Sequence, residues 1–420
     1  MKKRGEKPVT ETLVFKNRDK VELGTVEGDI EIRECRTIAP QQGAEIMIGG
    51  TLRIKGSCIV QGSLKAHGIE GKSCDPLEIE GDLTLATSLV VERGGVEIRG
   101  TAIARQISVD NELTVDGNLD CSAGKAGGSI RVGGNAKAMR LSAGGSIVIE
   151  KDAEVERLQA GGSIAVHGRI ESQEFDVGGS GKCNYGRIGK VVIGGSFRAE
   201  GAVEIEKIDV GGSAVVGTGS KVASIDVGGS FKSTGDLEFG DIDVGGAVKV
   251  EGSAKGSSID VGGTLRVENS LVLKDMLDVG GTVSVGENLE CSTIDVGGSL
   301  TVGERIDAQR IEIGGRIVAK HIKATDTFRI GKRGEVQGLV EARSILVRER
   351  ARADSLYGDE IRVEERGRVK SVYGRTVYLE REVTVEGEIL YTESYQAEDR
   401  VVLRSEPKKV DTLPPPDQLQ

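Results

Sequence analysis

Apolar and polar residues alternate along this chain in runs of three or four, the period expected of a half-buried β-strand. Leu265, Arg266 and Val267 form one such run, with the charged residue between two apolar ones. Successive side chains of a strand point to opposite faces, so each run predicts a short strand with one buried side. Similar runs recur about every 17 residues, which predicts that one small set of strands is repeated many times.

Pairs of glycines punctuate this alternation at nearly constant spacing. Nine of the eleven intervals between successive pairs are 17 residues long, one is 16 and one is 18. The first glycines of the pairs are Gly127, Gly144, Gly161, Gly178, Gly194, Gly211, Gly228, Gly245, Gly262, Gly280, Gly297 and Gly314. A fixed short period is typical of a solenoid, in which each repeat buries its apolar face only against its neighbours.

Each glycine pair is predicted to form a corner between two short strands. Glycine suits a corner because it tolerates positive φ and places no Cβ in a tight bend. An apolar residue directly precedes every pair, so a strand is expected to end there. The residues that we assign as structural corners are Gly144, Gly145, Gly161, Gly162, Gly211, Gly212, Gly228, Gly229, Gly245, Gly246, Gly262, Gly263, Gly297 and Gly298.

These patterns together predict an all-β protein, a parallel β-helix solenoid. A coil of about 17 residues divides naturally into three short strands, which predicts a three-sided coil whose strands pair in parallel with the next coil. Proline supports this interpretation, because none occurs between residues 77 and 406. Almost every backbone N–H of such a solenoid is needed for pairing, and proline has none.

A single continuous β-helix is expected over residues 21–403. Its three parts are irregular coils at 21–126, Gly-Gly repeats of 17 residues at 127–315, and coils rich in Arg and Glu at 316–403.

Two polar segments flank this solenoid and are expected to be disordered tails. Residues 1–20 have a basic start, and residues 404–420 contain three consecutive prolines and no apolar pattern. The proline tract is either a solvated tail or a segment that a protein partner binds.

No catalytic, cofactor-binding or metal site is predicted. The six cysteines form no CxxC motif, and Cys58 and Cys74 have His67 between them but no evident fourth ligand. His321 stands without the other residues that a β-helical acyltransferase needs. An Asp stands two residues before the glycine pair in six consecutive repeats, and this ladder either binds cations or forms a solvated, hydrogen-bonded face; its members are Asp209, Asp226, Asp243, Asp260, Asp278 and Asp295.

The net charge and the start of the sequence limit which partners and which cellular compartment are expected. The net charge of −10 argues against nucleic acid as a partner. The basic start is followed by no apolar segment, so we expect no secretory signal, and reduced cysteines then suit a cytoplasmic protein. No apolar run approaches the roughly 20 residues of a transmembrane helix, and the sequence leaves membrane association open.

Within the Arg- and Glu-rich section, residues 334–347 follow a G-x-V-x-G-x-V-x-A-x-x-I-x-V rhythm, and residues 365–389 continue in that style. This part of the chain resembles the bactofilin family of polymer-forming cytoskeletal proteins. The resemblance implies a right-handed, three-sided β-helix that assembles end to end into filaments without nucleotide. This chain is several times longer than a usual bactofilin domain, and no interface residue is carried over from the family.

We therefore predict a non-enzymatic structural protein that self-assembles end to end. A β-helical enzyme, of the acyltransferase or carbohydrate-active kind, and a surface adhesin remain the alternatives. The terminal coils of a β-helix carry unpaired backbone groups, which invite strand addition. The apolar residues expected at these ends, and hence at the assembly interface, are Leu13, Val14, Phe15, Ile389 and Leu390.

Overall fold

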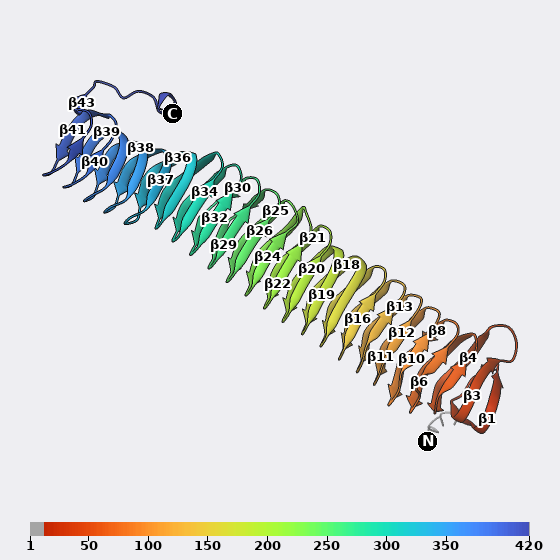
Figure 1. The fold of residues 1–420 in the computed structure, drawn as a ribbon. Helices are drawn as coiled ribbons and strands as arrows, with labels where there is room; N and C mark the ends of the chain where they lie inside the picture. The colour runs from red at the N-terminus through yellow and green to blue at the C-terminus, as the bar shows by residue number, and fades with distance from the viewer. Residues whose placement is uncertain (1–11, 420) are drawn as a thin grey trace, which may run out of the picture. The chain divides into compact units, whose positions relative to one another are not determined.

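The computed structural model describes residues 12–419, and these residues form parallel β-strands stacked coil upon coil (Figure 1). They contain no α-helix, only one short 3₁₀ helix, η1 (Pro416–Gln418). The chain divides into two compact units, Met1–Ile205 and Glu206–Gln420. The predicted all-β parallel solenoid is confirmed in each unit.

Unit 1 consists of short strands joined by bends. They are β1 (Leu13–Leu23), β2 (Thr25–Val26), β3 (Ile30–Pro40), β4 (Glu45–Lys55), β5 (Cys58–Val60), β6 (Ser63–Lys72), β7 (Leu77–Ile79), β8 (Leu83–Leu85), β9 (Ser88–Glu92), β10 (Val96–Ile98), β11 (Ala102–Val109), β12 (Leu113–Val115), β13 (Leu119–Ala126), β14 (Ile130–Val132), β15 (Ala136–Ala143), β16 (Ser146–Ile149), β17 (Ala153–Ala160), β18 (Ser163–Val177), β19 (Ser180–Ile193) and β20 (Ser196–Ala199). The division between the units falls within β21 (Val203–Val210).

Unit 2 repeats the same construction. Its strands are β22 (Ser213–Val216), β23 (Ser220–Val227), β24 (Ser230–Ser233), β25 (Leu237–Val244), β26 (Ala247–Val250), β27 (Ala254–Gly256), β28 (Ser258–Val261), β29 (Thr264–Val267), β30 (Leu271–Leu273), β31 (Met276–Val279), β32 (Thr282–Val285), β33 (Leu289–Val296), β34 (Ser299–Val302), β35 (Arg305–Ile313), β36 (Arg316–Ile330), β37 (Glu335–Val347), β38 (Arg352–Val363), β39 (Arg368–Leu379), β40 (Thr384–Val385), β41 (Ile389–Ala397), β42 (Val402–Leu403) and β43 (Lys408–Lys409).

Strand pairing shows that each coil has three faces. In unit 2, β25 spans two of them, because Leu237 pairs with Ala254 of β27 and Asp241 pairs with Ser258 of β28. The third is made by β26, which pairs with β29. We call the face that ends at the glycine pair the pre-glycine face, the one that begins after it the post-glycine face, and the remaining one the third face. The predicted three-sided coil is thus confirmed.

The core is a narrow interior filled mainly by aliphatic side chains, together with buried phenylalanines such as Phe175 and Phe328. In β33 the residues alternate between buried and exposed along each face, as the period of two requires. Ile242 and Ile259 are paired neighbours in one interior column and are 2% and 1% exposed. Full burial of such a side chain stabilises the fold by roughly 1.5–3 kcal/mol. The buried polar Ser233 satisfies its hydroxyl by donating to the backbone oxygen of Gly235 at 2.9 Å.

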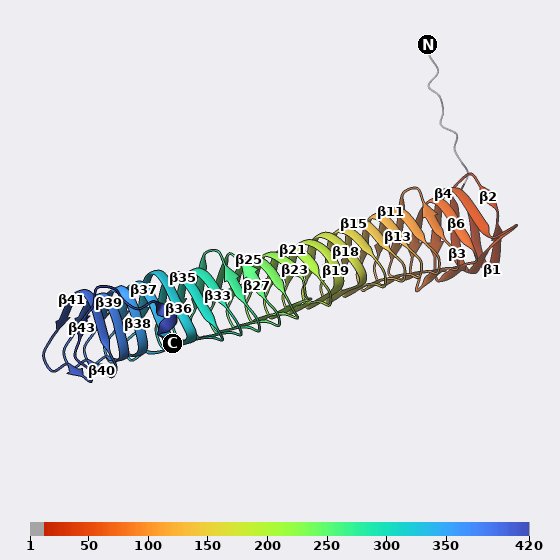
Figure 2. The same ribbon diagram turned by 90° about the horizontal axis from the view of Figure 1, so that it is seen from above.

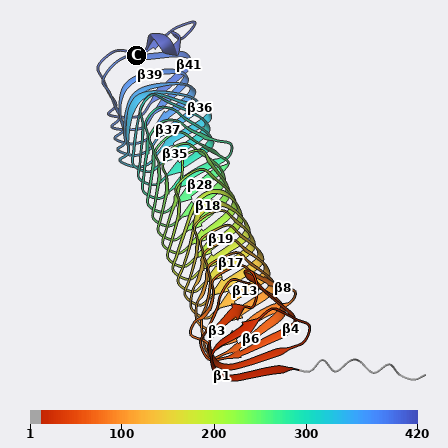
Figure 3. The ribbon, with the colours of Figure 1, turned by 90° about the vertical axis from the view of Figure 1, so that its right-hand side faces the viewer.

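The solenoid extends beyond both predicted boundaries. Strand β1 begins at Leu13 and is the outermost strand of unit 1, next to β3 (Figure 3), so the predicted tail of residues 1–20 is wrong for residues 13–20. Residues 1–11 of that tail lie outside the described residues. Charged outward residues such as Lys16 and Lys20 hide the alternation of β1 in the sequence. At the other end, β43 pairs with β41, so the predicted tail from residue 404 still includes a strand of the solenoid.

Candidate assembly interface

The predicted glycine corners lie where expected, but positive φ is not the reason for them. All of the described corner glycines sit at bends between the pre-glycine and post-glycine strands, and none has positive φ. A Cβ built on Gly263 would lie 2.2 Å from the carbonyl oxygen of Gly246, and one on Gly246 would lie 2.3 Å from that of Gly229. The backbones of successive corners are therefore in direct contact, and a side chain at any of them would clash with the preceding coil and force the two coils to separate.

A second corner column, between the post-glycine and third faces, is missing from the sequence-based predictions. In unit 1, the side chain of Asn118 accepts the backbone N–H of Asn135 at 2.8 Å. Asn135 in turn accepts from Asp152 at 3.2 Å, and Asp152 from Arg169 at 2.8 Å. Asn and Asp side chains bond neighbouring backbone in this way at turns. The Gly-Asn dipeptides at 117–118 and 134–135, one coil apart, carry the signal that would have revealed it.

From residue 331 onward the glycine pairs of unit 2 give way to charged turns. Arg333, Arg350, Arg366, Glu382 and Arg400 all have φ close to +60° at equivalent places in successive coils. Because a side chain in this region of φ is strained, the surrounding contacts must hold each turn in place.

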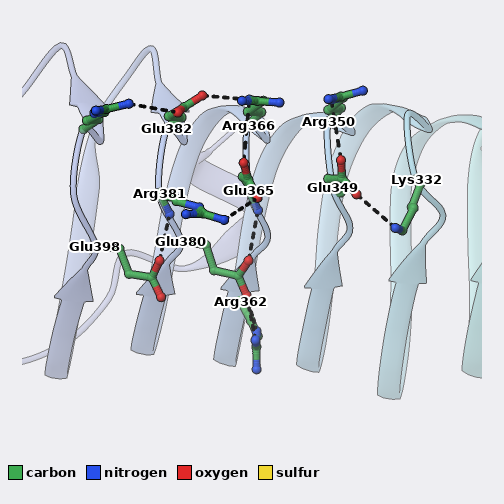
Figure 4. A network of polar contacts seen from close by, with 11 residues as sticks. Lys332, Glu349, Arg350, Arg362, Glu365, Arg366, Glu380, Arg381, Glu382 and Glu398 are labelled. Atoms are coloured by element: carbon green, nitrogen blue, oxygen red, sulfur yellow. Dashed lines mark hydrogen bonds and ion pairs between the residues drawn. The ribbon is translucent and has the colours of Figure 1, made fainter.

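Carboxylates from the following coil supply those contacts (Figure 4). Glu380 and Glu398 accept the backbone N–H groups of the turn residues Glu365 and Arg381 at 3.1 and 3.2 Å. Glu364 accepts the backbone N–H of Glu349 at 3.1 Å in the same way. Arg362 also donates to Glu380 at 2.6 Å from outside the turn.

Further ion pairs join successive turns along the stack. Lys332 lies 2.9 Å from Glu349, and Arg366 lies 2.7 Å from Glu382 (Figure 4). The hydrogen bond and charge of Lys332 lower the pKa of Glu349, and those of Arg366 lower the pKa of Glu382. These carboxylates are therefore held in the ionised form that their partners require.

The aspartate ladder exists as predicted along the pre-glycine face of unit 2. Pairing joins Asp226 to Asp243, Asp243 to Asp260, Asp260 to Asp278 and Asp278 to Asp295 in adjacent coils. Within residues 12–419, no group of three or more His, Cys, Asp and Glu side chains has an arrangement that could hold a metal ion. The ladder is a regular acidic surface, and its cation binding stays untested.

Cysteines and histidines are dispersed over the solenoid. All six cysteines are buried and free, and burial raises the pKa of Cys58, Cys121 and Cys183 to about 12. His167 Nδ1 lies 2.7 Å from Glu150, and His321 Nε2 lies 3.2 Å from Glu341. These two histidines each contact a different glutamate and are not part of one cluster.

The N-terminal end of unit 1 is an open strand edge. Within the described part of the chain, β1 pairs only with β3, so its other edge has no strand partner. Leu13 and Val14 are 45% and 48% exposed. The ring of Phe15 is partly covered by Arg18, whose guanidinium carbon lies 5.7 Å from the ring centroid. All three predicted interface residues of this end therefore lie on the terminal strand.

The predicted residues of the C-terminal end do not lie at a free edge. Ile389 is fully buried, and Leu390 pairs with Lys408 of β43, because the chain continues for almost another coil after them. The prediction of these two as terminal contacts is wrong for that reason. The free edge is instead the second part of β41, from Ser394 to Ala397, with no strand partner beyond it among residues 12–419.

Aromatic side chains stand at this C-terminal edge. The rings of Tyr391 and Tyr395 are 5.7 Å apart and tilted by 31°. The chain then turns back from the last coils of unit 2, and its C-terminal segment runs outside the stacked strands (Figures 1 and 2). Pro415 has extended dihedrals, φ −63° and ψ 145°, typical of polyproline II, and partner binding by this tract stays a prediction.

Comparisons with known proteins give no relative from which a function could be transferred: no family model matches the chain, and no curated protein or solved structure is significantly similar to it. Among the described residues, no helix has the length and apolar character needed to cross a membrane.

Proposed function

We propose that this protein is a non-enzymatic structural scaffold that self-assembles through its ends without a nucleotide. The open edge of β1, with its exposed Leu13 and Val14, is the observation that carries the proposal. A strand edge with apolar side chains is a template for pairing with another chain, whereas charged side chains blunt an edge. The apolar part of the β1 edge is its first three residues, Leu13 to Phe15, and the charged Lys16 and Lys20 follow.

The build of the solenoid supports a structural role. Its interior is a closed apolar core, and its most regular feature is a set of corners that stack coil upon coil, as with Gly246 and Gly263. Stability in such an array comes from contacts between neighbouring repeats, so the construction extends by adding further coils. The resemblance of residues 334–347 to bactofilins and the expected cytoplasmic location belong to this proposal as well.

Electron microscopy of the purified protein in nucleotide-free buffer tests the proposal. Negatively stained samples should contain particles longer than one chain, and their length should increase with protein concentration. Particles of single-chain length at every concentration would reject self-assembly. Adding ATP or GTP to a parallel sample is the matched control, and it should leave the length distribution unchanged.

A further inference from the structure

Both ends of the described chain end on the same two interior columns of the coil, where Leu13 and Ala397 are exposed and Phe15 and Tyr395 are half-buried. In unit 1, pairing carries the column of Leu13 through Ile30, Leu52, Ile69, Leu89, Ile107 and Gly124 to Leu141, three residues before a glycine pair. In unit 2, pairing carries the column of Ile225, also three residues before a pair, through Ile242, Ile259, Leu277, Ile294, Ile311, Phe328, Ile345, Ile361 and Val377 to Tyr395. Leu13 and Tyr395 thus hold equivalent positions.

The neighbouring interior column behaves in the same way. Phe15 stands in the column of Ala143, which directly precedes a glycine pair, and Ala397 stands in the equivalent column of Val227. Interior positions are buried along the body of each unit, but Leu13 is 45% exposed and Ala397 is also exposed. Apolar interior positions left open to water at two ends favour a partner that closes them.

The face of the coil on which the last strand ends is also followed by the face on which the first strand begins. The last strand of unit 2, β43, lies on the third face, because Lys408 pairs with Leu390. The next face along the coil is the pre-glycine face, and that is where β1 begins with Leu13. The first strand of a second copy would therefore continue the coil at the point where β43 ends, with Leu13 over Tyr395 and Phe15 over Ala397.

We infer that copies of this chain join head to tail, the β1 edge of one copy pairing in parallel with the Ser394–Ala397 edge of β41 in the next. The inference rests on the proposed self-assembly and adds its polarity and register to it. A large ring over the small Ala397 fits the volume of that column, and the added strand satisfies backbone groups on both edges. A contact of this heterologous kind leaves a free edge at each end of a row of copies, and it generates an open filament unless the rotation between copies closes a ring.

Engineered cysteines test the polarity directly. In this register Val14 lies beside Gln396, and paired residues on neighbouring strands are about 4.8 Å apart, within reach of a disulfide. Both side chains are exposed, whereas all six native cysteines are buried and are therefore not expected to react under mild oxidation. The variants are Val14→Cys, Gln396→Cys and the double variant, with Gln159→Cys as a control in the same column but far from either end.

Head-to-tail assembly predicts cross-linked species in the mixture of the two single variants, and a ladder in the double variant, on a non-reducing gel. Each single variant alone and the Gln159→Cys control should stay uncross-linked. Cross-linking of Val14→Cys alone would show joining of N-terminal ends and would overturn the inference, as would an assembled wild type whose mixed variants do not cross-link. A wild type that sediments as a monomer throughout would instead refute the proposed function itself.

Discussion

The glycine-pair corners of residues 228–315 and the charged turns of residues 331–400 occupy the same place in the coil of unit 2 but close it by opposite means. Ile313 and Ile330 pair at a separation of 17 residues, whereas Arg316 and Glu335, just after the corner, pair at a separation of 19. The first charged turn is thus two residues longer than the glycine corner before it. The extra residues carry the chain outward, where its N–H groups need new acceptors.

The comparison shows which residues each kind of turn needs in the sequence. A glycine corner depends on having no side chain, because backbone lies on backbone. A charged turn depends on one particular side chain of the next coil, such as Glu380 for the N–H of Glu365. The glycine pair is therefore the same at every such corner. The charged turns can differ from coil to coil as long as the carboxylate of the next coil is kept.

The largest loss of stability is expected when a side chain is added at a glycine-pair corner. Gly263→Ala places a Cβ 2.2 Å from the carbonyl oxygen of Gly246, so the coils must separate locally. Overpacking of this kind costs about 1–3 kcal/mol in the free energy of unfolding. Chemical denaturation followed by circular dichroism measures it, and Asp260→Ala on the adjoining strand is the matched control. Equal stability of the two variants would show that the corners do not need glycine.

The next largest loss of stability is expected when one hydrogen-bond acceptor is removed from a charged turn. Glu380→Ala deletes the partner of the Glu365 N–H and of Arg362, and the loss should be about 1 kcal/mol. Glu380→Gln keeps an acceptor oxygen and should retain more than half of that stability. Denaturation curves of the two variants decide the matter. If they coincide, the charge and not the backbone hydrogen bond stabilises the turn.

A smaller effect tests the left-handed residues of the charged turns. Arg366 has φ +59°, so Arg366→Gly relieves strain that Arg366→Ala retains, while both variants lose the ion pair to Glu382. Glycine should exceed alanine by about 0.5 kcal/mol in stability, after allowance for its greater freedom in the unfolded chain. This order is opposite to the one expected at Gly263. Alanine proving the more stable residue at both positions would remove the distinction between the two kinds of turn.

The smallest expected effect is a weakening of the charged turns at low pH. The pKa values of Glu349 and Glu382 are lowered in the folded protein, so their contribution is fully present above the ordinary glutamate pKa of 4.5 and is lost as the pH falls through the lowered values. Hydrogen exchange at the turn amides of 348–351, corrected for its intrinsic pH dependence, should accelerate below about pH 4.5, because the ion pair between Lys332 and Glu349 then no longer joins this turn to the one before it. The amide of Gly245, which bonds to the backbone oxygen of Val227 at a corner made of glycines alone, is the internal control. Equal acceleration at both places would contradict a specific role of the carboxylates.

The sequence predicted the glycine corners well because each one is a strict local requirement repeated at a fixed interval. It predicted their reason only in part, since φ at Gly263 is ordinary and the close approach of Gly246 arises between coils. The charged turns escaped prediction because a carboxylate and the N–H that it bonds lie about one coil apart, and the partner of Glu365 is recognisable only after pairing is known.

The ends were the hardest part to predict. Strand β1 was missed because Lys16 and Lys20 break the apolar pattern, which becomes visible only at Val21 and Leu23. Ile389 and Leu390 were predicted as terminal contacts, yet the coil continues beyond them and past residue 403, through residues with little apolar character such as Lys408 and Lys409. In a solenoid the backbone continues to pair after the hydrophobic signal fades, so hydrophobicity marks the core better than it marks the edge.

Sedimentation velocity across a range of protein concentrations, without nucleotide, tests most directly whether the molecule is a self-assembling scaffold. The wild type should show a sedimentation coefficient that increases with concentration. Leu13→Asp should abolish the increase while leaving the circular dichroism unchanged, because Leu13 is already 45% exposed at the terminal strand. Met139→Asp, at a position 58% exposed but away from both ends, should behave like the wild type. A wild type that remains a monomer at every concentration, or a Leu13→Asp variant that assembles as the wild type does, would contradict assembly through the ends.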